Sequence, residues 1–269
     1  MKNSVVLNDV EYGSHERQRL DILFPERVVN TRGVILFVHG GGWVHGDKSV
    51  HTDDAKYFCD KGYISATMNY RFVTEELHVP DILDDVTSAL KVIKEKCAEH
   101  GYKVDKLILS GGSAGAHIVL LYAYTRRSEA PIEPVAVGAY CPPVDCSKSD
   151  FLLGISGEFE DWKYEVLSKV CGVEMTKITF LEEAPQAALK KLSPCEYVTG
   201  DCVPTAVFHG RVDELIPFYH AVDYVKLLNE KGVKNDFVIY DNSNHALDKD
   251  PDASQKAKDV IESYAKMYL

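Results

Sequence analysis

Short, continuously apolar runs alternate along this chain with segments whose apolar residues recur every three or four positions. The run at 34–38 is apolar throughout, which is typical of a strand buried on both faces of a sheet. The segment 80–97 instead carries its apolar residues on one face of a helix. The pattern predicts strands at 19–24, 34–38, 63–68, 106–109, 135–140, 205–208 and 237–240, and helices at 80–97, 114–127, 218–229 and at the C-terminal end.

Strands that alternate with helices indicate an α/β protein with a mostly parallel sheet covered by helices on both faces. The segment 19–24 alternates apolar and polar residues and is expected to form one strand of an antiparallel entry hairpin. The alternation stops at 142–201, after the sixth core strand when both hairpin strands are counted. A long insertion between two core strands is more often a lid than a separate domain, so we expect one domain over 1–269 with a cap at 142–201.

Composition and charge exclude several classes of protein. The chain has 269 residues, of which 45% are hydrophobic and 26% charged, as in soluble globular proteins. No apolar run is long enough to span a membrane. The net charge of −11 repels phosphate backbones, so we expect no nucleic-acid partner. The seven cysteines form no CxxC pair and the first residues contain no apolar leader segment, so the expected location is the cytoplasm.

The clearest chemical motif is Gly111-Gly112-Ser113-Ala114-Gly115, which follows the predicted strand 106–109 and opens a predicted helix. A serine at such a turn sits in a strained backbone conformation, and glycines two residues before and after it leave room for the turn. The helix start beneath it offers backbone N–H groups. This context predicts a nucleophile elbow with Ser113 as the nucleophile; the alternative is an ordinary glycine-rich turn.

A second glycine-rich segment, His39-Gly40-Gly41-Gly42-Trp43, follows the strand at 34–38. Its glycines allow the backbone to approach a reacting carbonyl, so its N–H groups are candidates to stabilise an oxyanion. Two phosphate-binding motifs fit poorly. The dinucleotide motif would need glycine where His45 stands, and a Walker loop would not tolerate Asp47 between Gly46 and Lys48.

A serine nucleophile needs a base and a carboxylate that orients the base. Asp213 and His245 each follow a predicted strand, where the catalytic groups of parallel sheets gather. The order serine, aspartate, histidine is that of α/β-hydrolases. Glu214 and Asp241 are alternative acids, and Asp241 stands very near both its strand and His245.

The other histidines are assigned structural roles. We expect His117 to pack beneath the elbow, His209 to hold the turn that carries Asp213, and His39 to brace the glycine loop. The remaining ones without a motif are interpreted as surface or core residues: His15, His51, His78, His100 and His220.

Together these motifs resemble the α/β-hydrolase superfamily. Within it they are similar to the esterase/lipase branch related to hormone-sensitive lipase, with its small bacterial carboxylesterases and carbohydrate esterases. The motifs that carry this similarity are the glycine loop at 39–43, Asn69-Tyr70-Arg71, the elbow, His209-Gly210 through Asp213 and Pro217, and His245. The resemblance implies an oxyanion hole made by the N–H groups of Gly41, Gly42 and Ala114. A large N-terminal cap is usual in that branch, but the first core strand here begins near residue 34, so the cap is expected from 142–201.

The predicted function is a serine carboxylesterase that hydrolyses small acyl esters through an acyl-enzyme, with Ser113, Asp213 and His245 as the triad. No metal or cofactor is implied, because neither an HExxH motif nor a zinc-like cluster is present. Trp43 and the aromatic residues of the insertion are candidates for the substrate pocket, with core packing as the alternative. An arylformamidase or peptidase with the same triad, and a silent ligand-binding homologue, remain as alternative functions. The resemblance leaves a homodimer open, since dimers are common in the superfamily.

Overall fold

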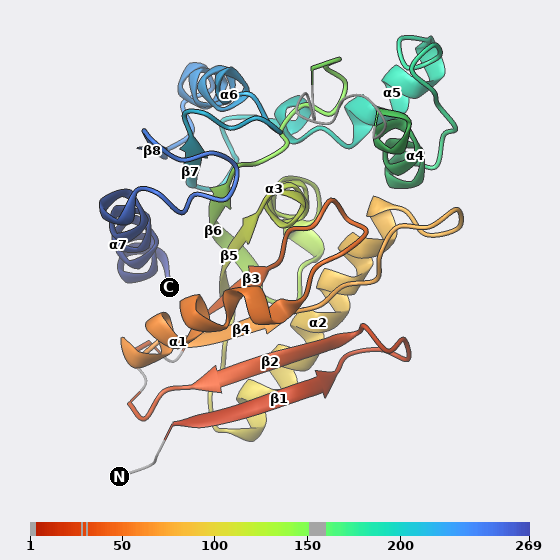
Figure 1. Cartoon of the computed structure of the whole chain (residues 1–269). Coiled ribbons are helices and arrows are strands. Elements are labelled where there is room, and N and C mark those ends of the chain that lie inside the picture. Colours follow the sequence, from red (N-terminus) through yellow and green to blue (C-terminus); the bar gives the residue numbers. More distant parts are fainter. Residues whose placement is uncertain (1–3, 28, 31, 151–159) are drawn as a thin grey trace.

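The computed structural model of the chain describes residues 4–27, 29–30, 32–150 and 160–269. Within them, eight strands form one sheet in the order β1-β2-β4-β3-β5-β6-β7-β8 (Figure 1). The pairs β1–β2 and β2–β4 are antiparallel, and all the following pairs are parallel. The strands are β1 (Val5–Glu11), β2 (Arg19–Phe24), β3 (Gly33–Val38), β4 (Ile64–Met68), β5 (Lys106–Gly112), β6 (Glu133–Tyr140), β7 (Thr205–Gly210) and β8 (Asn235–Tyr240).

Helices cover both faces of this sheet. One apolar cluster lies between the sheet and α2, α3 and α6, and a second lies between the sheet and α1 and α7. The central strands β3 and β4 are buried along their whole length, which agrees with their continuously apolar sequences. The helices are α1 (Thr52–Asp60), α2 (Val79–Glu99), α3 (Ala114–Thr125), α4 (Glu160–Cys171), α5 (Glu183–Lys191), α6 (Phe218–Glu230) and α7 (Pro251–Tyr268).

The predicted mostly parallel sheet with helices on both faces is confirmed, and each predicted strand and helix has a counterpart. Helix α1 is not among the elements that the hydrophobic pattern predicts. It has only nine residues and buries just Ala55, Phe58 and Cys59. Three buried positions in a short acidic segment give too weak a periodic signal to distinguish a helix from a loop.

The segment 142–201 contributes α4, α5 and a short 3-10 helix, Pro194–Tyr197, between β6 and β7. Figure 1 shows α4 and α5 together near the start of α2. His78, which precedes α2, bonds through Nδ1 to the carbonyl of Lys169 in α4 at 2.8 Å. The predicted cap residues Phe151 and Phe159 lie outside the described residues. The role of this segment as a cap therefore stays a prediction.

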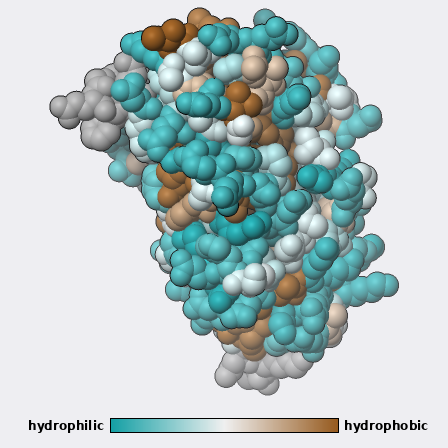
Figure 2. Space-filling view, turned by 90° about the vertical axis from the view of Figure 1, so that its right-hand side faces the viewer, coloured by the Kyte–Doolittle hydropathy of each residue, from teal (hydrophilic) through white to brown (hydrophobic). Residues whose placement is uncertain are grey.

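The face of the molecule drawn in Figure 2 is mostly hydrophilic, and its hydrophobic residues form small separate groups. This face includes the side on which α4 and α5 lie in Figure 1. No helix in the part of the chain that the structure describes has the length and apolar character needed to cross a bilayer.

Candidate active site

Ser113 occupies the turn between β5 and α3 with a backbone conformation that L-residues rarely adopt, φ 51° and ψ −121°. A non-glycine residue in such a conformation costs about 1–3 kcal/mol and persists only where its surroundings impose it. Here the Ser113 N–H donates to the carbonyl of Tyr140 in the neighbouring strand at 2.8 Å. The turn thus holds Ser113 at the end of β5, directly before the first residue of α3.

The glycines of the elbow differ in their steric roles. A Cβ at Gly111 would lie 2.6 Å from the backbone carbon of Gly115, and a Cβ at Gly115 would overlap the carbonyl oxygen of Val38 in β3. A Cβ at Gly112, in contrast, meets nothing within 4 Å. The two outer glycines are therefore required by close backbone packing, whereas the inner one is not.

We expect Gly115→Ala to lower the free energy of unfolding by about 3 kcal/mol, because the added methyl group can be relieved only by backbone movement. The matched variant Gly112→Ala, which adds the same methyl group to open space, should shift it by less than about 0.5 kcal/mol. Urea unfolding followed by circular dichroism measures both. Equal losses in the two variants would contradict this assignment of steric roles.

The glycine loop after β3 lies directly against this elbow. A Cβ at Gly40 would come within 2.7 Å of the Gly112 carbonyl oxygen and 3.2 Å of the Ser113 Cβ. Gly41 and Gly42 both adopt positive φ, 112° and 56°, and Trp43 follows with φ 62°. His39 Nδ1 lies 2.6 Å from the Gly40 carbonyl oxygen. The loop backbone is thus fixed next to Ser113.

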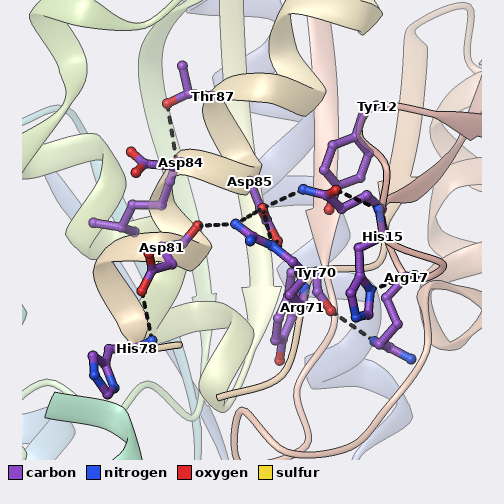
Figure 3. A network of polar contacts seen from close by, with 12 residues as sticks. Tyr12, His15, Arg17, Tyr70, Arg71, His78, Asp81, Asp84, Asp85 and Thr87 are labelled. Carbon is purple, nitrogen blue, oxygen red and sulfur yellow. Dashed lines mark hydrogen bonds and ion pairs between the residues drawn. The ribbon is translucent and has the colours of Figure 1, made fainter. Parts of the chain in front are cut away.

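The Asn69-Tyr70-Arg71 motif contacts this loop through Tyr70, and Figure 3 shows the polar contacts that hold Tyr70 and Arg71. The Tyr70 ring stacks on His39 at 4.4 Å, and its hydroxyl donates to the His39 carbonyl at 3.2 Å. Arg17 donates to the Tyr70 carbonyl at 2.9 Å, and Arg71 pairs with the buried Asp85 at 2.7 Å. The motif therefore has a structural role: it places Tyr70 under the glycine loop.

Arg17 also fixes the protonation of His39. Its guanidinium lies 3.2 Å from His39 Nε2 and 3.0 Å from the Gly46 carbonyl, to which it donates. Because a guanidinium can only donate, Nε2 accepts and the ring proton sits on Nδ1, where it bonds Gly40. Burial lowers the pKa of His39 to about 4, so the ring is neutral near pH 7.

His117 is also buried and lies on α3 in the first turn after Ser113, whose carbonyl accepts from its N–H at 3.0 Å. Its Nε2 lies 2.7 Å from the Leu192 carbonyl in the 142–201 segment, and its Nδ1 accepts from the Trp43 indole at 3.2 Å. Burial lowers the pKa of His117 to about 4. It therefore connects the elbow helix, the glycine loop and the 142–201 segment as a neutral ring.

The lowered pKa values of His39 and His117 predict loss of stability in acid. Below about pH 6.5 these two histidines are protonated in the unfolded chain but stay neutral in the native protein. The free energy of unfolding therefore falls as pH drops from 6.5 towards 4. Each ring contributes up to about 3 kcal/mol over that interval. His117→Gln should make the pH dependence shallower in urea unfolding series, whereas His15→Gln, at an exposed position, should not. An unchanged slope in His117→Gln would contradict this prediction.

Asp213 and His245 meet across two loops, which follow β7 and β8. His245 Nδ1 lies 2.8 Å from Asp213 Oδ2. The other carboxylate oxygen accepts the backbone N–H groups of Leu215 and Ile216, both at 2.9 Å. Burial alone would raise the pKa of Asp213, but hydrogen bonds from His209 and His245 hold it well below its usual value. Asp213 is thus an ionised, immobilised carboxylate that directs the His245 ring.

His209 lies beneath this pair, with its side chain fully buried. Its Nε2 is 2.9 Å from the Ile216 carbonyl and 3.3 Å from Asp213 Oδ2. It therefore bonds to both ends of the turn that carries the acid. The alternative acids point elsewhere: Asp241 pairs with Arg211 at 2.7 Å on the surface, and Glu214 accepts from Asn244 at 3.5 Å.

Ser113, Gly40 and His245 line one cavity of about 410 Å³. Within the described residues, no hydrogen bond joins the Ser113 hydroxyl to His245. Proton transfer requires these groups to come within about 2.6–3.2 Å, a contact that often tightens only when substrate binds. The structure thus brings the three predicted triad residues to one site, with the bond from acid to base already formed.

The aromatic candidates for the substrate pocket lie in different environments. Trp43 is 1% exposed, and its indole packs edge-on against His117 at 5.2 Å. Trp43 therefore packs in the core, and its contact with substrate stays a prediction. Phe180 is buried against Tyr164. Trp162 of α4 lies 3.9 Å from the position of a Cβ at Gly42, which places it above the glycine loop.

Among the described residues, one group has the side chains and spacing to hold a metal ion: Cys141, His209 and Asp213, whose ligand atoms lie within 4.8 Å of one another. Asp213 already accepts hydrogen bonds on both oxygens, and burial raises the pKa of the Cys141 thiol well above its usual value. Metal binding would need a thiolate here and would remove the acid from His245. The donor set therefore fits the hydrogen-bonded triad better than a metal centre.

Sequence reasoning missed the far part of the cavity, where Tyr140, His51, Asp54 and Lys258 form the lining. His51 was interpreted as a surface or core histidine, because it belongs to no motif. These residues come from β6, a 3-10 helix, α1 and α7, so only the packing of α1 and α7 on one face of the sheet brings them together. No local pattern in the sequence carries that information.

The chain matches one family profile and several curated proteins. The sequence profile of the BD-FAE family matches residues 20–228. Over 256 residues the chain is 27% identical to a "probable isoprenylcysteine alpha-carbonyl methylesterase" from Oryza sativa subsp. japonica, covering 90% of this chain and 57% of the relative. It is 26% identical to the "probable carboxylic ester hydrolase LipM" of Mycobacterium tuberculosis, covering 89% of this chain and 56% of the relative. The chain thus spans little more than half the length of these relatives.

Two solved structures that share this fold are esterases. Esterase B from Lactobacillus rhamnosis superposes with a TM-score of 0.78 at 19% identity, covering 98% of this chain and 86% of its own. A thermophilic esterase from Thermogutta terrifontis gives 0.72 at 22% identity, covering 97% of this chain and 93% of its own. At these identities the likeness concerns the fold, and it confirms the predicted α/β-hydrolase fold.

Proposed function

This chain belongs to the BD-FAE family, and from that membership and the geometry of its site we propose that it is a serine carboxylesterase that hydrolyses small acyl esters. One observation carries the proposal. The 2.8 Å bond from His245 Nδ1 to the buried Asp213 directs the other ring nitrogen away from the acid, and His245 shares a cavity with Ser113 at its strained turn. This is the arrangement in which a serine hydroxyl can be activated as a nucleophile.

In the proposed acylation step, Ser113 Oγ attacks the ester carbonyl carbon while His245 Nε2 takes the hydroxyl proton. Asp213 keeps the ring proton on Nδ1 and stabilises the imidazolium that forms. The carbonyl oxygen gains the negative charge of the tetrahedral intermediate. When the intermediate collapses, the bond to the alcohol oxygen breaks and His245 returns its proton to the departing alcohol.

The backbone N–H groups of Gly41, Gly42 and Ala114 are proposed to hold the oxyanion. The positive φ values of Gly41 and Gly42 and the position of Ala114 at the start of α3 support this assignment. Such preorganised donors contribute about 3–4 kcal/mol each to stabilisation of the transition state. In deacylation, His245 takes a proton from water as the water attacks the acyl carbonyl. When this second tetrahedral intermediate collapses, the bond to Ser113 Oγ breaks, His245 returns the proton to Oγ, and the acid is released.

A substrate panel tests this proposal. Purified protein is assayed on p-nitrophenyl esters with acyl chains from C2 to C12, on acetylated sugars, and on matched anilide and formanilide amides. We expect turnover of the esters, with a broad optimum at C4–C8 for a general carboxylesterase or a sharp C2 preference with sugar activity for a carbohydrate acetyl esterase. Turnover of amides without any ester would establish the amidase alternative, and no turnover together with no labelling by a fluorophosphonate probe would establish a silent homologue.

A further inference from the structure

The cavity next to Ser113 continues away from the 142–201 segment, between α1 and α7. Gly40, Gly112, Ser113 and His245 form its near end. Its walls are partly apolar, with Val50 and Leu247 among them, and its far part is lined by residues of α1 and α7 together with the ends of β6 and β8. The cavity thus leads from the nucleophile to the side of the sheet opposite α3, and its volume of about 410 Å³ is within the range of small-molecule sites.

Tyr140 provides a polar group inside this cavity. It is the last residue of β6, its carbonyl accepts the Ser113 N–H, and its ring packs on Phe208 at 4.3 Å. The side chain is partly exposed to the cavity, and no hydrogen bond of its hydroxyl is found among the described residues. Burial and the nearby Asp54 carboxylate raise the pKa of Tyr140 well above its usual value, so the group is a neutral hydroxyl.

His51 provides a second polar group whose bonding is incomplete. It is 9% exposed, and its Nδ1 lies 3.0 Å from Asp54 Oδ2. Because the carboxylate can only accept, Nδ1 carries a proton, and Nε2 is the ring nitrogen left to bond another group. Among the described residues Nε2 has no partner. A buried polar atom without a partner destabilises the free protein, and a ligand group that bonds to it would remove that cost.

The charges at this end of the cavity balance. Asp54 Oδ1 lies 3.7 Å from Lys258 Nζ, and both groups line the cavity. Because the carboxylate and the ammonium offset each other, this end of the cavity favours a neutral polar group over a carboxylate. A hydroxyl suits it, because it can accept from Tyr140 while it donates to Asp54 or bonds His51 Nε2, as either donor or acceptor.

The two halves of an ester have different requirements at such a site. The acyl half stays bonded to Ser113 until water attacks, whereas the alcohol leaves first and needs a path outwards. A cavity that begins at Ser113 and runs back between two helices suits the half that stays. We propose, on the basis of the proposed esterase function, that this cavity takes the acyl half and that Tyr140 and His51 select acyl groups with a hydroxyl at their far end.

The test compares two ethyl esters of equal acyl length, ethyl 6-hydroxyhexanoate and ethyl heptanoate, in which a hydroxyl replaces a methyl group. Titration of the released acid gives kcat/KM for both. We expect the wild-type enzyme to favour the hydroxylated ester by about tenfold or more, and Tyr140→Phe to reduce this ratio about tenfold, the effect of one lost hydrogen bond. Tyr122→Phe is the matched control, since its hydroxyl bonds Thr87 in the other apolar layer and its ratio should match that of the wild type.

A second pair of substrates checks which half enters the cavity: 5-hydroxypentyl acetate and hexyl acetate. If Tyr140→Phe changes the ratio for this pair and not for the acyl pair, the cavity takes the alcohol and the proposal is overturned. The proposal is also overturned if the wild-type enzyme hydrolyses the two acyl esters with a kcat/KM ratio near one and neither Tyr140→Phe nor His51→Leu changes that ratio. His51→Leu should reduce the acyl ratio in the same direction, which keeps the test decisive if Tyr140→Phe folds poorly. Failure of the wild-type enzyme to hydrolyse any of the four esters would instead remove the proposed function.

Discussion

Ser113→Ala is expected to lower kcat for p-nitrophenyl ester hydrolysis by about 10⁵-fold or more. The variant removes the atom that forms the acyl-enzyme, so only the oxyanion donors and substrate binding remain, and these alone leave a small residual rate. The methyl group of alanine fits where the serine Cβ already stands, so the fold should persist. Ester hydrolysis, labelling by a fluorophosphonate probe and urea unfolding measure the three consequences separately.

Ser110→Ala is the matched control for this variant. Ser110 lies on β5, which leads into the elbow, its hydroxyl is buried, and it has no hydrogen-bond partner among the described residues. The same atom is therefore removed close to the elbow but away from the proposed chemistry, and both turnover and labelling should stay within about twofold of the wild type. Near-normal turnover by Ser113→Ala, with the probe still bound, would place the nucleophile elsewhere.

Asp213→Asn should have the second largest effect, a fall of about 10⁴-fold in kcat near neutral pH. An asparagine amide facing His245 Nδ1 favours the tautomer with the proton on Nε2, which can no longer accept the Ser113 proton. The kcat for a p-nitrophenyl ester against pH is the measurement. Because Asp213 Oδ1 also accepts two backbone N–H groups, asparagine can keep those bonds with its carbonyl oxygen, so the fold should survive.

Asp241→Asn and Glu214→Gln test the alternative acids in the same assay. Asp241 pairs with Arg211 at the surface and not with His245, so its loss should change kcat by less than about threefold. An exposed ion pair of this kind contributes only about 0–1 kcal/mol to stability, so the fold should persist. A larger loss in Asp241→Asn than in Asp213→Asn would reverse the assignment of the acid.

The elbow could be predicted from the sequence because its chemistry is local. The five residues 111–115 stand between a strand and a helix, and the steric need for glycine at 111 and 115 arises within the turn and from the adjoining β3. The strands were likewise predictable, because burial on both faces of a parallel sheet requires continuous apolar runs. The short helix α1 was not, since its three buried positions leave little periodic signal.

The bond between Asp213 and His245 could be proposed from chain order but not established by it. Both residues follow strands, as Asp241 does, and the sequence alone leaves more than one acid open. Two features of the tertiary structure distinguish them. The turn after β7 buries Asp213 against two backbone N–H groups and His209, whereas Asp241 faces solvent beside Arg211.

By itself, the sequence determined the alternation of strands and helices, the tight turn at Ser113 and the glycine loop, because steric fit and hydrophobic burial act over a few neighbouring residues. The shape and polarity of the cavity were decided only by the tertiary structure. Tyr140, His51, Asp54 and Lys258 belong to four different elements, and they meet because α1 and α7 pack on one face of the sheet. Contacts between residues this far apart in the chain depend on how whole elements pack, which no short stretch of sequence encodes.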